Sequence, residues 1–422
     1  MDTTPTPTTP ATAATPPRGG ALQGLLASAK YYLGLIMLIA IGIVFSPHDA
    51  EGGNIFLSSS NLSDVFRQVS NIGVISVGMT LVIIAGGIDL SVGSTMSLGS
   101  VLTAMLLTQA GWNGASGFAL AVSAPMLFGL VLALLLAFGR LRGSTPFDGA
   151  PPKAPVVALA VALAAAAGYA ALVVTLLPGK LPLWLVLLVV PLAGCAMGVV
   201  NGTVITRGRM QPFIVTLASM VAIMGAARLI SGQDTAVHAI YSGTNATRDI
   251  EALRALLAGI VPVPALFFLG AALVFGFVLS RTVFGTYLYA IGGNERAARL
   301  SGLRVDRHKV ATYAISGMLS ALVGVLFAAQ FRQGKADAGQ GWELDAIAAV
   351  VIGGTTLTGG AGRISGTIAG VLIFGFLGNI LLLNNIDSNT QLLLKGVIIV
   401  VAVFLQQTPL TRLTAALRRR DS

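Results

Sequence analysis

Long runs without a charged residue dominate the pattern of this chain. A helix needs about 20 residues to cross the roughly 30 Å hydrocarbon layer of a membrane, and nearly every run reaches that length. The 50-residue run is too long for one helix, and Trp112-Asn113-Gly114 divides it. The pattern predicts an all-α polytopic membrane protein with ten to twelve transmembrane helices. The runs cover residues 31–48, 68–88, 90–139, 154–179, 181–206, 210–227, 255–280, 310–331, 346–362, 364–386 and 396–411.

The composition supports a membrane protein. Of the 422 residues 55% are hydrophobic and 10% are charged, whereas soluble domains carry about 25% charged residues. With a mean hydropathy of +0.84, such a chain cannot cover a water-facing surface. A soluble enzyme and a disordered chain are therefore excluded. The single cysteine, Cys195, also excludes a disulfide-stabilised secreted scaffold.

Basic residues predict the orientation, because Lys and Arg gather in cytoplasmic loops. The same rule explains the net charge of +10 without nucleic acid as a partner. We expect residues 49–65, the region of Trp112, Lys180, and residues 233–251, 333–341 and 384–389 on the external side. Both termini are expected in the cytoplasm. The basic positions that mark the cytoplasmic side are Arg140, Arg142, Arg207, Arg209, the cluster Arg281 to Lys309, Arg363, Arg412 and Arg418 to Arg420.

The same pattern predicts the domain organisation. Residues 1–28 are expected to form a disordered cytoplasmic tail, since residues 1–20 are rich in Thr, Pro and Ala and resemble no cleavable signal peptide. Residues 29–410 form the predicted transmembrane domain, and 411–422 a basic cytoplasmic tail. Within the domain, the proline-rich linker and alanine-rich run of 143–177 indicate an inserted hairpin.

Two glycine motifs indicate an internal repeat. GGIDLSVG at 86–93 and GGTTLTGG at 353–360 share a pattern at an offset of 267 residues, and each lies between two apolar runs. In a chain with 51 glycines the match also fits chance. Glycine pairs break or closely pack membrane helices, and transporters place their pathway at paired broken helices. The candidate pathway residues are Gly86, Gly87, Asp89, Ser91, Gly353, Gly354, Thr355 and Thr356.

Asp89 is the most informative single residue. It separates a 21-residue apolar run from the 50-residue run, where an ionised carboxylate is costly unless it reaches water or a partner. Asp89 or Ser91 can cap the next helix, and a role in the pathway is the alternative. Glu343 and Asp345 precede a later run and are expected at the membrane interface.

Enzymatic chemistry finds no support in the sequence. None of the six lysines is followed by Ser or Thr, so the chain lacks a Walker A loop and an ATP site. His48, His238 and His308 fall in predicted loops without the spacing of a metal site. We expect no metal, no bound cofactor and no catalytic residues.

The segment 281–309 contains a short helix by its own signals. Asn294 is a good N-cap, Glu295 complements the positive end of the helix dipole, and Gly302 can end the helix in a left-handed conformation. We expect Ala297 and Ala298 to form a bare face for another protein. The candidate coupling residues are Gly293, Asn294, Glu295, Ala297, Ala298 and Gly302.

Motifs along residues 60–407 resemble the ribose/galactose/xylose-type permease subunits of bacterial ABC importers. Glu295-x-Ala297-Ala298-x-x-x-Gly302 is similar to the loop by which importer permeases contact their ATPase, although Arg296 replaces its first alanine. The resembling segments are GGIDLSVGS at 86–94, NG at 201–202, PFIVTL at 212–217, YAIGGNERAARLSG at 289–302, ELDAIAAVVIGGTTLTGGAGRISGT at 343–367 and KGVIIVVAV at 395–403.

The resemblance implies a multi-pass permease of the bacterial inner membrane. It implies a second permease copy, or a related permease, and ATP-binding cassette subunits that hold ATP-Mg. It also implies an external binding protein that delivers a sugar, and membrane lipid around the chain. A secondary transporter driven by an ion gradient is the alternative from another class, but it would place ionisable residues inside several spans. Within the family, polyols, nucleosides and furanosyl autoinducers are alternative substrates.

Overall fold

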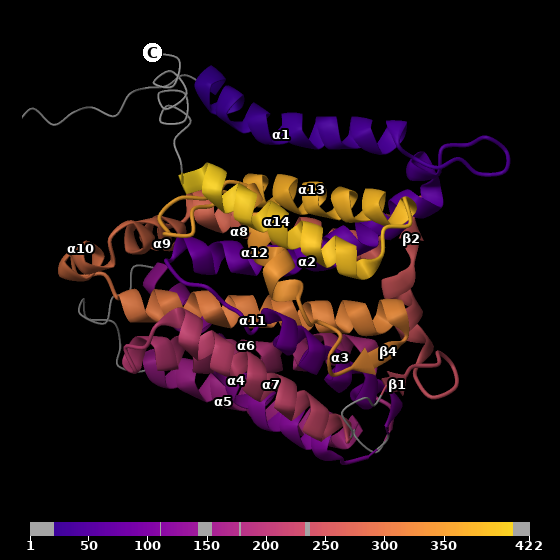
Figure 1. Cartoon of the computed structure of the whole chain (residues 1–422). Coiled ribbons are helices and arrows are strands. Elements are labelled where there is room, and N and C mark those ends of the chain that lie inside the picture. The colour runs from indigo at the N-terminus through magenta and orange to yellow at the C-terminus, as the bar shows by residue number, and fades with distance from the viewer. Residues whose placement is uncertain (1–20, 110, 142–153, 177–178, 233–236, 408–422) are drawn as a thin grey trace, which may run out of the picture.

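The computed structural model describes residues 21–109, 111–141, 154–176, 179–232 and 237–407, and in these ranges the chain is a bundle of helices (Figure 1). The predicted all-α membrane fold is confirmed. The α-helices are α1 (Ala21–Val44), α2 (Ser59–Ile84), α3 (Val92–Thr108), α4 (Gly114–Leu141), α5 (Ala154–Leu176), α6 (Leu183–Arg207), α7 (Pro212–Ser231), α8 (Val263–Arg281), α9 (Val283–Gly293), α10 (Glu295–Leu300), α11 (Val305–Phe331), α12 (Trp342–Ile352), α13 (Ile364–Leu383) and α14 (Ser388–Gln407).

Most apolar runs form helices of spanning length. Among the described residues eight helices are long and apolar enough to cross a membrane, namely α2, α4, α5, α6, α7, α8, α11 and α13. Two shorter apolar helices are residues Leu33–Val44 of α1 and all of α3. The predicted division of residues 90–139 is confirmed, because α3 ends at Thr108 and α4 begins at Gly114.

Two predicted boundaries are wrong. The run 346–362 is not one span, because α12 ends at Ile352 after 11 residues and residues 353–363 are irregular. Gly354, Gly359 and Gly360 take positive φ angles there, which a helix cannot continue through. At the other end of the chain, α1 begins at Ala21, so residues 21–28 are helical and not part of a disordered tail. Residues 1–20 and 411–422 lie outside the described residues.

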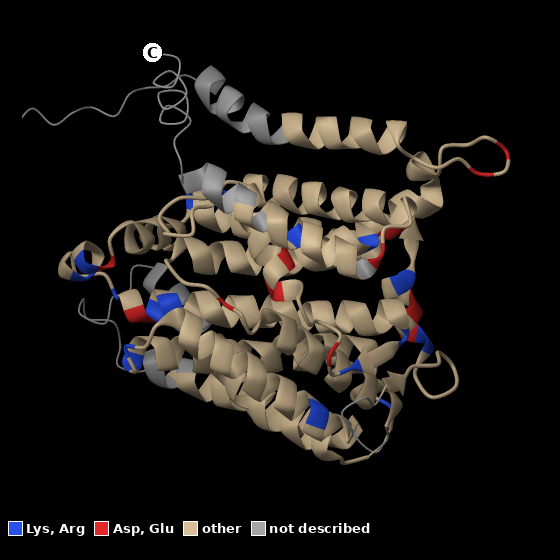
Figure 2. Ribbon diagram, in the orientation of Figure 1, with Lys and Arg blue, Asp and Glu red and all other residues tan. Residues whose placement is uncertain are grey.

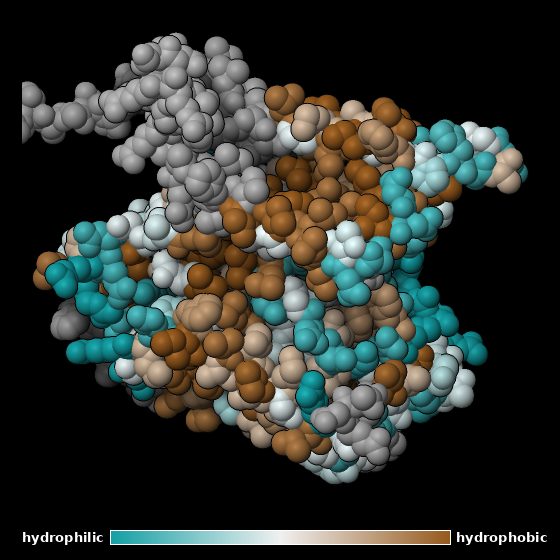
Figure 3. All heavy atoms as spheres, in the orientation of Figure 1, coloured by the Kyte–Doolittle hydropathy of each residue, from teal (hydrophilic) through white to brown (hydrophobic). Residues whose placement is uncertain are grey.

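The bundle has two polar ends. At one end, strand β1 (Val237–Ala239) pairs antiparallel with β4 (Gln333–Lys335), and β2 (Leu256–Leu257) pairs with β3 (Val261–Pro262). The 3₁₀ helix η2 (Arg248–Arg254) lies at this sheet end too, while η1 (Ile55–Leu57) precedes α2. The opposite end carries α10 (Figure 1). Figure 2 shows charged residues gathered mainly at these two ends, and Figure 3 shows hydrophobic surface mostly between them.

This arrangement agrees with the predicted grouping of loops. Residues 233–251 and 333–341, both predicted external, contribute the paired strands β1 and β4. Arg207 and Arg209, both predicted cytoplasmic, line one cavity together with Arg299 of α10. The side of the membrane that each end faces stays a prediction.

Labelling tests that orientation. Tyr241 at the sheet end is 60% exposed and Leu300 on α10 is 85% exposed, so neither position needs a large side chain for packing. In a background without Cys195, a membrane-impermeant thiol reagent should label Tyr241→Cys in intact cells. Leu300→Cys should be labelled only after permeabilisation. Labelling of Leu300→Cys in intact cells would contradict the predicted orientation.

Helices α6 and α11 pack at the centre because glycines let their backbones approach. Gly194, Gly198 and Gly202 lie one turn apart on one face of α6. A side chain at Gly198 would collide with the carbonyl oxygen of Tyr313 on α11, and one at Gly202 would lie 2.6 Å from the Cα of Val310. Small residues at such spacing are how membrane helices pack closely.

Helices α4 and α5 pack against each other, and α5 is mostly exposed. The hairpin predicted for 143–177 includes residues 143–153 and 177, which lie outside the described residues. Its assignment as an insertion stays a prediction.

Candidate translocation and coupling site

The first glycine motif forms a turn between α2 and α3. The amide of Gly86, which has a φ of +77°, donates to the carbonyl of Ile83, and that of Gly87 donates to Val82. A side chain at Gly87 would meet the hydroxyl of Tyr313. The turn places Asp89 inside the bundle with 1% of its surface exposed.

The Asp89 carboxylate has serine donors on both of its oxygens. Oδ1 accepts from the Ser91 amide at 3.0 Å and from the Ser91 hydroxyl at 2.6 Å. Oδ2 accepts from Ser316 of α11 at 2.8 Å. The Ser91 hydroxyl accepts in turn from Asn201 of α6 at 2.9 Å, and Ser219 of α7 donates to Asn201. We call these five residues the Asp89 cluster.

The cluster joins four parts of the bundle, namely the turn before α3 and helices α6, α7 and α11. The neighbouring carbonyl of Ile88 accepts from Thr216 of α7 at 3.2 Å and from Tyr313 of α11 at 3.4 Å. Buried polar groups that find partners from several helices specify one arrangement of those helices. The cluster therefore holds the break between α2 and α3 in place.

The predicted helix cap is wrong. Ser91 is the N-cap residue of α3 but makes no side-chain cap hydrogen bond. A capping oxygen must reach the second or third amide of the helix, whereas the Asp89 oxygen reaches the amide of the N-cap residue itself. The Asp89 carboxylate instead joins Ser91 to Ser316 of α11.

The second motif packs one helix end against the next helix. A side chain at Gly353 would collide with the carbonyl of Gly366 on α13. Gly354 has a φ of +86°, and the Thr355 amide donates to Val350 at 3.2 Å. The Thr356 hydroxyl donates to Gly359 at 3.0 Å, which closes the loop on itself. Whether these residues line a pathway stays a prediction.

The acidic residues in the first turn of α12 are more buried than expected. Asp345 pairs with Lys395 of α14 at 2.9 Å, and its side chain is 14% exposed. The charge of Lys395 is what makes this burial possible, because an unpaired buried carboxylate would be far more costly. Glu343 is half-buried.

Helix α10 forms as its sequence predicts. The Asn294 side chain accepts from the Ala297 amide at 3.0 Å, and Gly302 takes a φ of +82° after the helix. Burial alone would raise the pKa of Glu295, but the hydrogen bond and charge of Lys309, helped by Arg299, outweigh it and lower this pKa. Hydrogen bonds to Asp306 and Glu295 raise the pKa of Arg299. These pairs attach α10 to the first turns of α11.

The prediction that Ala297 and Ala298 form a bare face of α10 holds for Ala297 but not for Ala298. Ala298 is 6% exposed and packs against Ile291 and Val305 of this same chain. Ala297 is exposed, and Leu300 is 85% exposed at the α10 end. Because residues 297 and 298 are about 100° apart around a helix, they cannot share one face. The exposed residues of α10 are Arg296, Ala297, Arg299 and Leu300, and its exposed apolar surface is therefore formed by Ala297 and Leu300.

Three polar residues of the Asp89 cluster were not among the predicted site residues. Asn201, Ser219 and Ser316 are polar residues inside apolar helices, and such positions are a usable signal of function. The loop 207–211 was identified only as basic, yet it lines a cavity of about 670 Å³ together with Glu295, Arg299 and Lys309.

Comparison with known proteins identifies the family. The family model described as "Branched-chain amino acid transport system / permease component" matches residues 61–144 and 153–403. The ribose import permease protein RbsC of Bacillus subtilis is 34% identical over 91% of this chain and 94% of that protein. RbsC of Escherichia coli K12 is 32% identical over 90% and 93%.

The xylose transport system permease protein XylH of E. coli K12 is 31% identical over 92% of this chain and 95% of that protein. No solved structure matches the chain. The two matched segments of the family model leave out only residues 145–152 between them. The chain therefore belongs to this family of membrane permease components, together with the ribose and xylose permeases.

Proposed function

We propose that this chain is the membrane-spanning permease subunit of an ATP-driven ABC importer that brings a pentose, a hexose or a related compound into the cytoplasm. The observation that carries the proposal is the sequence similarity of this chain to ribose and xylose permeases, which are 31% to 34% identical to it over at least 90% of its length. The intact α10, with Leu300 and Ala297 on its outer face, supports it.

The proposal assigns the other functions to partners. ATP-Mg binds to separate ATP-binding cassette subunits, which contact α10. An external binding protein delivers the sugar at the sheet end. A second permease copy, or a related permease, completes the membrane part, with lipid around the remaining hydrophobic surface. In this arrangement the α10 end and both termini face the cytoplasm.

Reconstitution tests this function. The purified complex of permease and ATPase is placed in liposomes with the binding protein outside and ATP-Mg inside. We expect uptake of labelled ribose or xylose that requires ATP and persists when an ionophore collapses ion gradients. If only a polyol, a nucleoside or a furanosyl compound is taken up, that compound class would replace the sugar as the proposed substrate. Uptake that needs an ion gradient and no ATP would refute the proposal in favour of secondary transport.

A further inference from the structure

Glycines from three distant parts of the sequence meet at one point. They are Gly86 after α2, Gly292 in the last turn of α9, and Gly359 with Gly360 in the loop between α12 and α13. The amide of Gly360 donates to the carbonyl of Ile84, the last residue of α2, at 3.0 Å. We call these four glycines the glycine junction.

The contacts in the junction are between backbones. A Cβ atom on Gly359 would lie 2.9 Å from the Cα of Gly86 and 3.0 Å from the carbonyl oxygen of Gly292. A Cβ on Gly292 would collide with the carbonyl oxygen of Ile84 and the amide nitrogen of Gly360. Real Cβ atoms do not approach other atoms this closely, so only glycine fits at these positions.

Each segment that meets at the junction leads directly to a part of the site. Asn294 is both the C-cap of α9 and the N-cap of α10, so Gly292 lies two residues before that shared cap. Gly86 lies three residues before Asp89, in the turn between α2 and α3. Gly359 and Gly360 are the last two residues of the second motif, in the loop that leads to α13. The junction is therefore the place where the end of α9, which leads into α10, contacts the Asp89 turn and the second motif.

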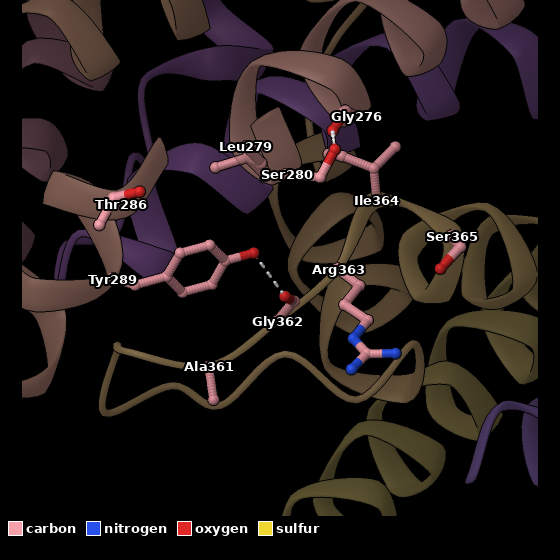
Figure 4. Close-up of a pocket in the computed structure, with 10 residues that line it drawn as sticks. All are labelled: Gly276, Leu279, Ser280, Thr286, Tyr289, Ala361, Gly362, Arg363, Ile364 and Ser365. Atoms are coloured by element: carbon pink, nitrogen blue, oxygen red, sulfur yellow. Dashed lines mark hydrogen bonds between the residues drawn. The ribbon is translucent and has the colours of Figure 1, made fainter. Parts of the chain in front are cut away.

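A hydrogen bond fixes α9 to the same loop a short way along. The Tyr289 hydroxyl of α9 donates to the carbonyl of Gly362 at 2.9 Å (Figure 4). Beside this bond is a cavity of about 870 Å³ between the end of α8, α9 and residues 361–365. The loop thus touches α9 at two points and has open space on one side.

Besides the buried packing of Ala298, charged side-chain pairs attach α10 to α11, and these pairs are softer than the junction. Glu295 and Arg299 reach α11 through side-chain pairs with Lys309 and Asp306, and three of these four side chains are 43% to 49% exposed. Exposed pairs of long side chains are weak and adapt to small displacements. Backbone-to-backbone contacts have no rotatable side chain that could absorb a displacement, so they pass it on.

We propose that the glycine junction transmits movement of α10 to the Asp89 turn and to the loop 353–363, and so couples the ATPase to the transport pathway. Gly86, Gly292, Gly359 and Gly360 are positioning residues in this proposal, and none of them binds sugar or ATP. The proposal rests on the proposed function, because an ATPase must act on α10.

The test compares Gly292→Ala with a matched control, Gly270→Ala. Gly270 lies in α8, where an added Cβ meets no atom within 4 Å. The reconstituted complex reports ATPase co-purification, ATP hydrolysis and sugar uptake. For Gly292→Ala we expect the ATPase to co-purify and hydrolyse ATP within twofold of the parent, while uptake per ATP falls at least tenfold. Gly270→Ala should match the parent in all three measurements.

A milder variant keeps the test decisive if Gly292→Ala does not fold. Tyr289→Phe removes only the hydroxyl that bonds Gly362, and we expect it to lower uptake per ATP two- to fivefold with unchanged hydrolysis. Parental uptake per ATP in an assembled Gly292→Ala complex would overturn the proposal. So would parental uptake per ATP in Tyr289→Phe, if Gly292→Ala fails to fold. Absence of ATP-driven uptake in the parent complex would instead refute the proposed function.

Discussion

Asp89→Leu is expected to reduce sugar uptake at least tenfold, whereas Asp89→Asn keeps most of it. Leucine leaves the Ser91 amide and the hydroxyls of Ser91 and Ser316 without their acceptor. Each orphaned buried group costs about 1–3 kcal/mol. Asparagine keeps one acceptor oxygen for Ser91, and its amide can donate to Ser316, because a hydroxyl also accepts. It also removes a buried charge, which favours folding.

Uptake by the reconstituted complex and thermal unfolding of the permease measure this prediction together. Asp89→Leu should lower the unfolding temperature as well as uptake, since the cluster joins α6 and α11 to the turn. Normal uptake in Asp89→Leu would contradict a role for the cluster. Equal losses in both variants would instead show that the negative charge of Asp89 is itself required.

Leu300→Asp is expected to remove the ATPase while the permease stays folded. Leu300 is 85% exposed in this chain, so its replacement disturbs no internal packing. Burying a leucine side chain at an interface contributes about 1.5–3 kcal/mol, and an aspartate there would add an unpaired charge. We expect co-purification of the ATPase to fall at least tenfold in a pull-down.

Leu257→Asp at the sheet end is the matched control, because Leu257 is an exposed leucine, 46% exposed, at the opposite end of the bundle. It should keep the ATPase at the parental level. Retention of the ATPase by Leu300→Asp would show that α10 is not the contact. Ala298 is unsuitable for this test, because a bulky residue there would overpack the contact with Ile291 and Val305.

The sequence was sufficient for features that depend on neighbours along the chain. Charge-free runs predict membrane helices because backbone groups in the hydrocarbon layer must form their hydrogen bonds within the segment itself. This requirement holds whatever the packing of the helices against one another. The limits of α10 followed from Asn294 and Gly302 because capping is a contact within a few residues. The grouping of loops at the two ends followed from span parity, and the pairing of β1 with β4 confirms that two of the loops predicted to be external share one end.

Contacts between distant segments were decided only by the tertiary structure. Asp89 was identifiable as an unusual residue, but its partner Ser316 and the Asn201 that donates to Ser91 lie more than a hundred positions away, so a local cap was predicted wrongly. Ala298 faces inward because of where α9 and α11 lie, which the sequence of α10 does not encode. The motifs that contain Gly86 and Gly359 predict helix breaks or close approaches, whereas no such prediction was made for Gly292. That they approach one another depends on how α2, α9 and the loop after α12 pack, and packing is a property of the whole bundle.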